Sequence, residues 1–225
     1  MINLISAAEA VTILFTFRRL SVLNEKQKNL VLNIISAFLL CFNIFRYAIQ
    51  SFKAGEMRIP VDFSAVSYFL VPAIVLMRLG ALRVWAAYSG VLAGSGYFLC
   101  MTVFGDMAYA GYKPSSVASA LLCHGALLIC GLLIISEKEF SPFTGWIITI
   151  GLIGISLHAF LLRDHFAGGN GIFIYELLFA FRPIAFFGGG IIPFYYVLLF
   201  ALVILSFNMF YRLNVRLSKQ KFRTF

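Results

Sequence analysis

Long apolar stretches alternate along the chain with short polar or basic ones, and this pattern predicts membrane-spanning helices. A helix needs roughly 20 predominantly apolar residues to cross the hydrocarbon core of a bilayer. Strands of a membrane β-barrel would instead alternate polar and apolar residues over about 10 positions, which this chain does not do. Stretches of sufficient length without a formal charge lie at 84–105, 114–136, 140–162 and 183–211. We therefore expect an all-α, polytopic membrane bundle.

The apolar pattern predicts about seven transmembrane helices in a single membrane domain, 1–225, with a short basic cytoplasmic tail at 213–225. Segment 170–190 contains Glu176, Arg182 and three consecutive glycines. Irregular backbone survives at membrane depth only against protein or water, so we expect this segment to be re-entrant or interfacial. The predicted spans lie at about 4–19, 29–50, 59–79, 84–105, 116–136, 143–163 and 193–212.

Composition supports a membrane protein and excludes several other classes. The chain is 61% hydrophobic and 12% charged, whereas soluble domains are about half apolar and about a quarter charged. The net charge of +9 does not indicate nucleic-acid binding, because the basic residues lie in loops and in the C-terminal tail. The four cysteines fall inside apolar segments and show no spacing typical of disulfides or zinc sites. We expect no metal, no cofactor and no nucleic-acid partner.

The basic residues predict an orientation in the membrane. Cytoplasmic loops are enriched in Lys and Arg. With seven spans and the N-terminus outside, only Lys53, Arg58, Lys113, Arg163 and Arg182 fall in outer segments. An eighth full span would move the basic tail to the side opposite the first basic loop. The residues expected on the cytoplasmic side are Arg18, Arg19, Lys26, Lys28, Arg78, Arg83, Lys138, Arg212, Arg216, Lys219, Lys221 and Arg223.

Polar side chains from five predicted spans fall at one depth, in the outer half of the membrane. Ionisable groups inside a bilayer are rare, usually face the bundle interior and indicate function by default. We predict a polar pocket in which Asp62 and Glu9 are counter-charges to Arg46. The alternatives are a purely structural ion-pair network and, for single residues, a charge that reaches the headgroups. The residues are Glu9 in the first span, Asn43 and Arg46 in the second, Asp62 and Ser64 in the third, His124 in the fifth and His158 in the sixth.

Glycines in the fourth and sixth predicted spans have a structural interpretation. Small residues let membrane helices approach each other closely. We expect such contact faces at Gly90, Gly94 and Gly96, and at Gly151 with Gly154.

Three short motifs resemble the YwaF-type integral membrane proteins of bacteria, which are related to a eukaryotic transmembrane lipid acyltransferase. That family opens its third helix with Leu-Pro-x-His-x-Cys, and the corresponding stretch here is Ile59 to Ser64, "IPVDFS". A His-Gly pair matches His124 and Gly125, and an asparagine in the loop after the sixth helix corresponds to Asn170. The resemblance implies lipid acyl chemistry in a bacterial cytoplasmic membrane.

The catalytic residues that this resemblance implies differ from the family pattern. Ser64 stands in the position of the cysteine, and Asp62 in that of the histidine. A hydroxyl nucleophile needs an adjacent base, and His124 is our candidate for it. Cys100 and Cys123 are alternative thiol nucleophiles. Arg46 would hold the phosphate or carboxylate of a lipid headgroup, and we expect the ligand-binding residues to include Asn43, His158, Glu9 and Asn170.

Two other functions fit the same residues. The pocket could bind or transport a small polar or lipid-like ligand, although the sequence lacks the internal repeat and the paired broken helices typical of alternating access. Alternatively, the protein could be a non-catalytic subunit whose charges pair with a membrane-protein partner or with a second copy of the chain. Membrane lipids are the partners expected in every case.

Overall fold

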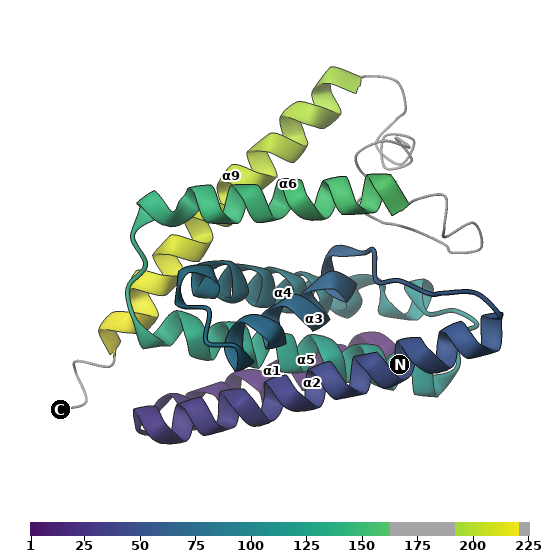
Figure 1. Cartoon of the computed structure of the whole chain (residues 1–225), viewed down its shortest axis with the longest axis horizontal. Helices are drawn as coiled ribbons and strands as arrows, with labels where there is room; N and C mark the ends of the chain where they lie inside the picture. Colours follow the sequence, from purple (N-terminus) through teal and green to yellow (C-terminus); the bar gives the residue numbers. More distant parts are fainter. Residues whose placement is uncertain (163–191, 221–225) are drawn as a thin grey trace.

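A computed structural model describes residues 1–162 and 192–220, and in this part of the chain every regular element is a helix (Figure 1). Each of the seven predicted ranges overlaps an α-helix. The predicted segment at 170–190 and the end of the basic tail lie outside the described residues. The α-helices are α1 (Ile2–Ser21), α2 (Glu25–Ala54), α3 (Phe63–Leu76), α4 (Arg83–Ala108), α5 (Pro114–Glu137), α6 (Gly145–Leu162) and α9 (Ile192–Gln220).

Five of these helices are long and apolar enough to cross a membrane, which agrees with the all-α membrane fold. They are the helices in Glu25–Ala54, Gly80–Ala108, Pro114–Glu137, Pro142–Ala159 and Phe200–Lys219. Helix α3 is apolar but has only 14 residues. Helix α1 is not among the five, and it contains one glutamate and two arginines.

Helix α3 is shorter than the predicted span 59–79. Residues 59–62, at the start of the predicted span, are not helical. Pro60 disfavours helical backbone in the residue before it and has no N–H to donate. Asp62 then occupies the N-cap position with φ −62° and ψ 150°. At the other end, Arg78 adopts a positive φ of 55° and stops the helix.

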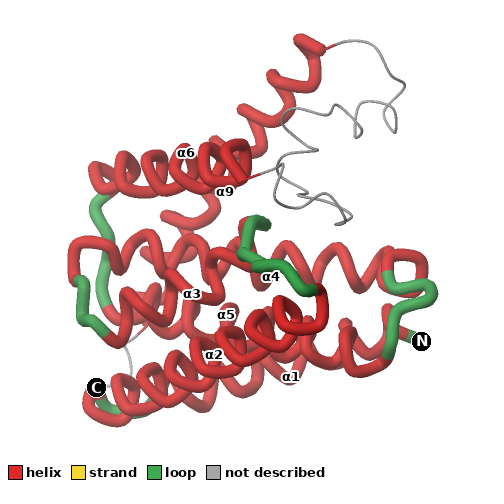
Figure 2. The backbone as a smooth tube through the Cα atoms, turned by 45° about the vertical axis from the view of Figure 1, so that its right-hand side comes forward, coloured by secondary structure: helices red, strands yellow, loops and turns green. Residues whose placement is uncertain are grey.

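Helix α5 is the centre of the fold. In its most apolar stretch 67% of the residues are buried, against 11% to 22% in the other four candidate spans. Both views show α4 on one side of α5 and α1 and α2 on the other (Figures 1 and 2). Its buried side chains therefore form the core of a bundle made by α1 to α5.

Glycines bring the backbones of α4 and α5 into direct contact. A Cβ atom on Gly90 would lie 2.8 Å from the carbonyl oxygen of Leu127, and one on Gly131 would lie 2.6 Å from the amide nitrogen of Val91. Gly94 has a similar contact with Leu128. These positions agree with the predicted contact face for Gly90 and Gly94.

Two of the predicted contact glycines have no such role. Among the described residues, neither Gly96 nor Gly154 has an atom within 4 Å of a Cβ built on it, so the predicted contact is not found at either position. Gly151 does form a contact face, since its Cβ would lie 2.4 Å from the ring of Trp85 on α4.

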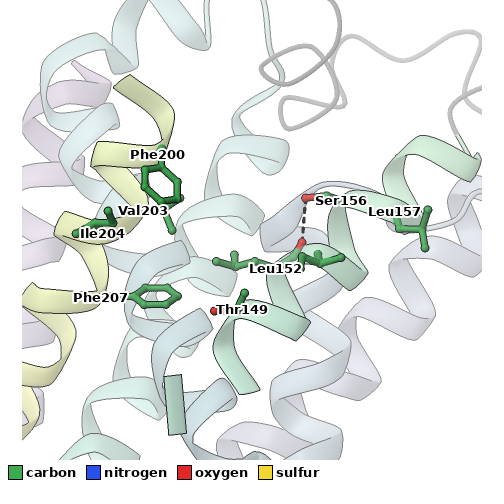
Figure 3. A pocket seen from close by; sticks show the side chains of 9 residues that line it. Thr149, Leu152, Ser156, Leu157, Phe200, Val203, Ile204 and Phe207 are labelled. Carbon is green, nitrogen blue, oxygen red and sulfur yellow. Dashed lines mark hydrogen bonds between the residues drawn. The ribbon is translucent and has the colours of Figure 1, made fainter. Parts of the chain in front are cut away.

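Helices α6 and α9 lie outside this bundle, on the side of α4 (Figures 1 and 2). The hydroxyl of Tyr88 on α4 lies 2.8 Å from that of Ser206 on α9. Between α6 and α9 an open groove of about 660 Å³ is lined by Thr149, Leu152, Ile153, Ser156, Leu157, Phe200, Val203, Ile204 and Phe207 (Figure 3). The two hydroxyls in this lining donate to carbonyl groups of their own helix, so the groove offers an apolar surface.

The bundle is held together at the end where α5 finishes and α4 begins. Arg83 forms an ion pair with Glu137 at 2.7 Å. Asn214 of α9 is fully buried there, and its amide nitrogen donates to the carbonyl groups of Ile135 and Lys138, each at 2.8 Å. Its oxygen accepts from the backbone N–H of Phe140 at 2.7 Å. Asn214 thereby satisfies backbone groups that the end of α5 leaves without helical partners.

Candidate functional site

His124 lies in the interior of the bundle on α5, and 7% of its surface is exposed. Its Nδ1 atom is 2.8 Å from the carbonyl oxygen of Ala120, one helical turn earlier. The Tyr68 hydroxyl of α3 lies 2.9 Å from Nδ1 and 3.1 Å from Nε2. A neutral ring satisfies these contacts if Nδ1–H donates to Ala120 and the Tyr68 O–H donates to Nε2.

The His124 ring is also fixed by an aromatic neighbour from α4. The ring of Tyr97 stacks on it with a centroid separation of 3.7 Å and an angle of 8°. The Tyr97 hydroxyl is hydrogen-bonded to that of Tyr109 at 2.9 Å. Three helices therefore hold the imidazole: α5 through its backbone, α3 through Tyr68 and α4 through Tyr97.

Arg46 of α2 lies beside this group and is half-buried. Its guanidinium carbon is 5.4 Å from the ring centre of Tyr47 and 5.9 Å from that of Tyr68. Its Nε atom is buried and has no hydrogen-bond partner within the described ranges. The arginine is close enough to the hydroxyl of Tyr109 and to the ring of His124 for its charge to act on both.

Asn43 is fully buried one turn before Arg46 and faces α5. Its amide nitrogen donates to the carbonyl group of Leu39 at 2.8 Å and lies 3.6 Å from the sulfur of Cys123. This contact places the Cys123 thiol in the same buried region. Cys100, the other alternative nucleophile, is exposed.

Asp62 and Ser64 lie at the start of α3, near Tyr47 and Tyr68 respectively. The Asp62 carboxylate makes no capping hydrogen bond to α3, and its charge acts on the Tyr47 hydroxyl. The Ser64 side chain lies near the Tyr68 hydroxyl, one helical turn further along α3. His124 itself bonds to Tyr68 and not to Ser64.

Glu9 and His158 lie around this centre and not within it. The Glu9 carboxylate lies beside Gly125, with Oε1 3.4 Å from the position of a Cβ atom there. His158 of α6 contacts the carbonyl oxygen of Pro60 through Nε2 at 2.9 Å, so it reaches the loop before α3. Asn170 lies outside the described residues.

The structure thus brings Arg46, Ser64 and His124 to Tyr68, with Asp62 near Tyr47 and Asn43 beside Cys123, but not as the ion pairs that we expected. Among the described residues, no ion pair within 4.0 Å joins Arg46 to Asp62 or to Glu9. The positive charge faces tyrosine rings where we expected carboxylates.

The four tyrosines are the site residues that the sequence did not reveal: Tyr47, Tyr68, Tyr97 and Tyr109. Tyrosine is common in this chain, with 10 copies, and suits apolar and interfacial positions equally well. A usable signal was the spacing of Tyr68, which lies four residues after Ser64 on the same helical face.

Within the described ranges, no group of three or more His, Cys, Asp or Glu side chains is arranged to hold a metal ion. Neither a family model, nor a curated protein, nor a solved structure matches this chain. Any inference about function therefore depends on the chemistry of the residues themselves.

Proposed function

We propose that this protein is a seven-pass membrane protein whose polar cluster binds a polar or lipid-like ligand reversibly. The polar cluster consists of Asn43, Arg46, Tyr47, Asp62, Ser64, Tyr68, Tyr97, Tyr109, Cys123 and His124. It lies in the half of the bundle where α1 begins, α2 ends and α3 and α5 begin.

The distribution of basic residues supports an extracytoplasmic opening of the cluster. Helices α1, α3, α5 and α9 end at the side opposite the cluster, and α2 and α4 begin there. Basic residues near a membrane mark the cytoplasmic side. The described basic residues at that side are Arg18, Arg19, Lys26, Lys28, Arg78, Arg83, Lys138, Arg212, Arg216 and Lys219.

The observation that carries the proposal is the hydrogen bonding of His124. A histidine that activates a nucleophile needs a ring nitrogen directed at a serine or cysteine. Both ring nitrogens here are engaged by Tyr68 and Ala120, and Tyr97 covers one face. The imidazole is a fixed part of a polar wall, which suits recognition of a ligand better than proton transfer to a nucleophile.

Lipid acyl transfer or acyl-ester hydrolysis is our second candidate. The observation in its favour is the position of Ser64 beside the Tyr68 hydroxyl, which in turn bonds to His124. A proton could pass from Ser64 through Tyr68 to the imidazole. This route would make Ser64 the nucleophile and His124 the base.

Two measurements on detergent-purified protein separate these functions. Reversible binding predicts that ligands raise the unfolding temperature, and that Tyr68→Phe weakens the effect while Tyr112→Phe leaves it unchanged. Tyr112 is exposed and its hydroxyl makes no hydrogen bond among the described residues. Acyl chemistry predicts labelling of Ser64 by a fluorophosphonate that is lost in His124→Gln. Labelling of this kind would contradict reversible binding as the main function.

A further inference from the structure

The surroundings of Arg46 contain more hydrogen-bond donors than acceptors. A guanidinium group has five N–H donors and cannot accept. Among the described residues the Nε donor of Arg46 is buried without an acceptor, although buried polar groups in folded proteins nearly always have one. The hydroxyls of Tyr47 and Tyr109 lie near the arginine and can donate as well, whereas the Tyr68 O–H is engaged with His124.

The acceptors nearest in sequence and space are directed elsewhere. The amide group of Asn43 faces Leu39 and Cys123. The Glu9 carboxylate lies beside Gly125, and no ion pair within 4.0 Å joins Arg46 to it or to Asp62. The described part of the chain therefore supplies a positive charge and hydroxyl donors at one point, without a carboxylate in contact with the guanidinium.

The aromatic rings give this arginine a defined position. Tyr47 and Tyr68 present their rings to the guanidinium carbon at 5.4 Å and 5.9 Å, within the range of cation–π contact. A cation–π contact engages the charge and no N–H group, so the N–H groups that are not bonded to Tyr47 can bind a planar or tetrahedral anion. Because Arg46 is only half-buried, a ligand can reach it from outside the bundle.

We infer that Arg46, with the hydroxyls of Tyr47 and Tyr109, forms a binding site for an oxyanion, that is, a carboxylate or a phosphate group. This inference rests on the proposed reversible binding and specifies its ligand class. An anion would provide the acceptor that the Nε atom lacks. Its charge would be held strongly, since a site of low dielectric constant strengthens the attraction between opposite charges. The group can belong to a lipid or to a free anion.

Thermal unfolding of the full-length protein in a neutral detergent, followed by tryptophan fluorescence, tests this inference. The probes are oleate and oleoyl-lysophosphatidate as lipid anions, acetate and inorganic phosphate as free anions, and monoolein as a neutral lipid of the same chain length. We expect the anions to stabilise the protein and monoolein to have a much weaker effect. Stabilisation by acetate or phosphate alone would identify a free anion, and stabilisation by the lipid anions only would identify a headgroup.

Substitutions show whether the effect comes from this site. Arg46→Gln should raise the apparent Kd of the active anion roughly tenfold to hundredfold, as expected for loss of a charge-assisted hydrogen bond. The matched control is Arg83→Gln, because Arg83 also has a buried Nε atom without a partner but is ion-paired with Glu137 at the other end of the bundle. This control should leave the Kd unchanged. Tyr47→Phe, which keeps the ring, should raise it a few fold and serves if Arg46→Gln does not fold.

Two results would overturn the inference, and they differ in what else they affect. If monoolein stabilises as strongly as oleate and Arg46→Gln keeps that effect, the site does not recognise an anion, but a cluster that binds ligands reversibly remains. If no probe stabilises the wild-type protein, both the oxyanion site and the proposed reversible binding are wrong.

Discussion

The helices of the α1–α5 bundle pack against each other in a different way from helices α6 and α9. In the bundle, glycines let α4 and α5 touch backbone to backbone, and α5 is buried on most sides. Helices α6 and α9 instead join the bundle through side chains, such as Tyr88 with Ser206, and leave an apolar groove between them. Most of the polar cluster lies in the bundle.

This difference indicates why the cluster lies where it does. A polar group in a membrane needs partners from several helices at once, because lipid offers none. Helix α5 has close neighbours in several directions and supplies them, as His124 shows with Tyr68 and Tyr97. The lining of the α6–α9 groove is mostly apolar and offers no such partners among the described residues.

The largest effect should come from the backbone contact between α4 and α5. In Gly131→Leu the new side chain meets the backbone of Val91 and Gly90, which cannot move aside. We expect a loss of about 3 kcal/mol or more in the free energy of unfolding. The matched control is Gly96→Leu on α4, which has open space and should change stability by about 0.5 kcal/mol or less. Denaturation in detergent measures both, and equal stability of the two variants would contradict the contact.

The next effect tests the strongest link between α9 and the bundle. Asn214→Leu removes three hydrogen bonds, leaving the buried N–H of Phe140 and the carbonyl groups of Ile135 and Lys138 without this partner. A loss of about 2 kcal/mol or more is expected from groups left unsatisfied. Asn208→Leu is the control, because Asn208 on the same helix is exposed and bonds only to its own helix at Ile204. If both variants unfold at the same temperature, α9 is not held by Asn214.

A smaller effect is expected at the polar cluster itself. Tyr68→Phe leaves a ring nitrogen of the buried His124 without its donor, which should cost about 1–2 kcal/mol. Tyr112→Phe should be neutral. The unfolding free energy without ligand checks the prediction. An unchanged value for Tyr68→Phe would mean that the His124–Tyr68 bond contributes nothing to the stability of the bundle.

The smallest effect should distinguish a side-chain contact from a backbone contact. In Gly151→Ala the added methyl group meets the ring of Trp85, a side chain and not a backbone segment. We expect a loss of about 1 kcal/mol, below that of Gly131→Leu. Gly154→Ala has open space and is the control on the same helix. A change in tryptophan fluorescence in Gly151→Ala, but not in Gly154→Ala, would confirm that the added methyl group displaces Trp85.

The helices could be predicted from the sequence because length and polarity alone limit what crosses a membrane. The boundaries of α3 were less accurate, since its start depends on the local geometry of Pro60 and Asp62. The contacts of the glycines were also not predictable from the sequence alone. Gly96 and Gly131 are alike in sequence, but only Gly131 faces a neighbouring backbone, and the facing depends on how α4 and α5 are rotated.

The polar cluster was predictable in its charged members and not in its hydroxyl groups. Arg46 and His124 stand out in apolar segments because their burial is costly. Tyr68 and Tyr97 do not stand out, because tyrosine suits many positions in a membrane helix. Their role depends on which tyrosines the packing of α3 and α4 directs at His124, and this information is not local in the sequence.

The position of Asn214 has a consequence for how the chain is made. Its partners Ile135, Lys138 and Phe140 leave the ribosome about 75 residues before it does, as the sequence separations of 79, 76 and 74 show. Until α9 is synthesised and inserted, the end of the central helix keeps its open carbonyl groups. The end of the central helix is therefore completed only when α9 is in place, and we expect a nascent chain stalled before α9 to keep these backbone groups unsatisfied.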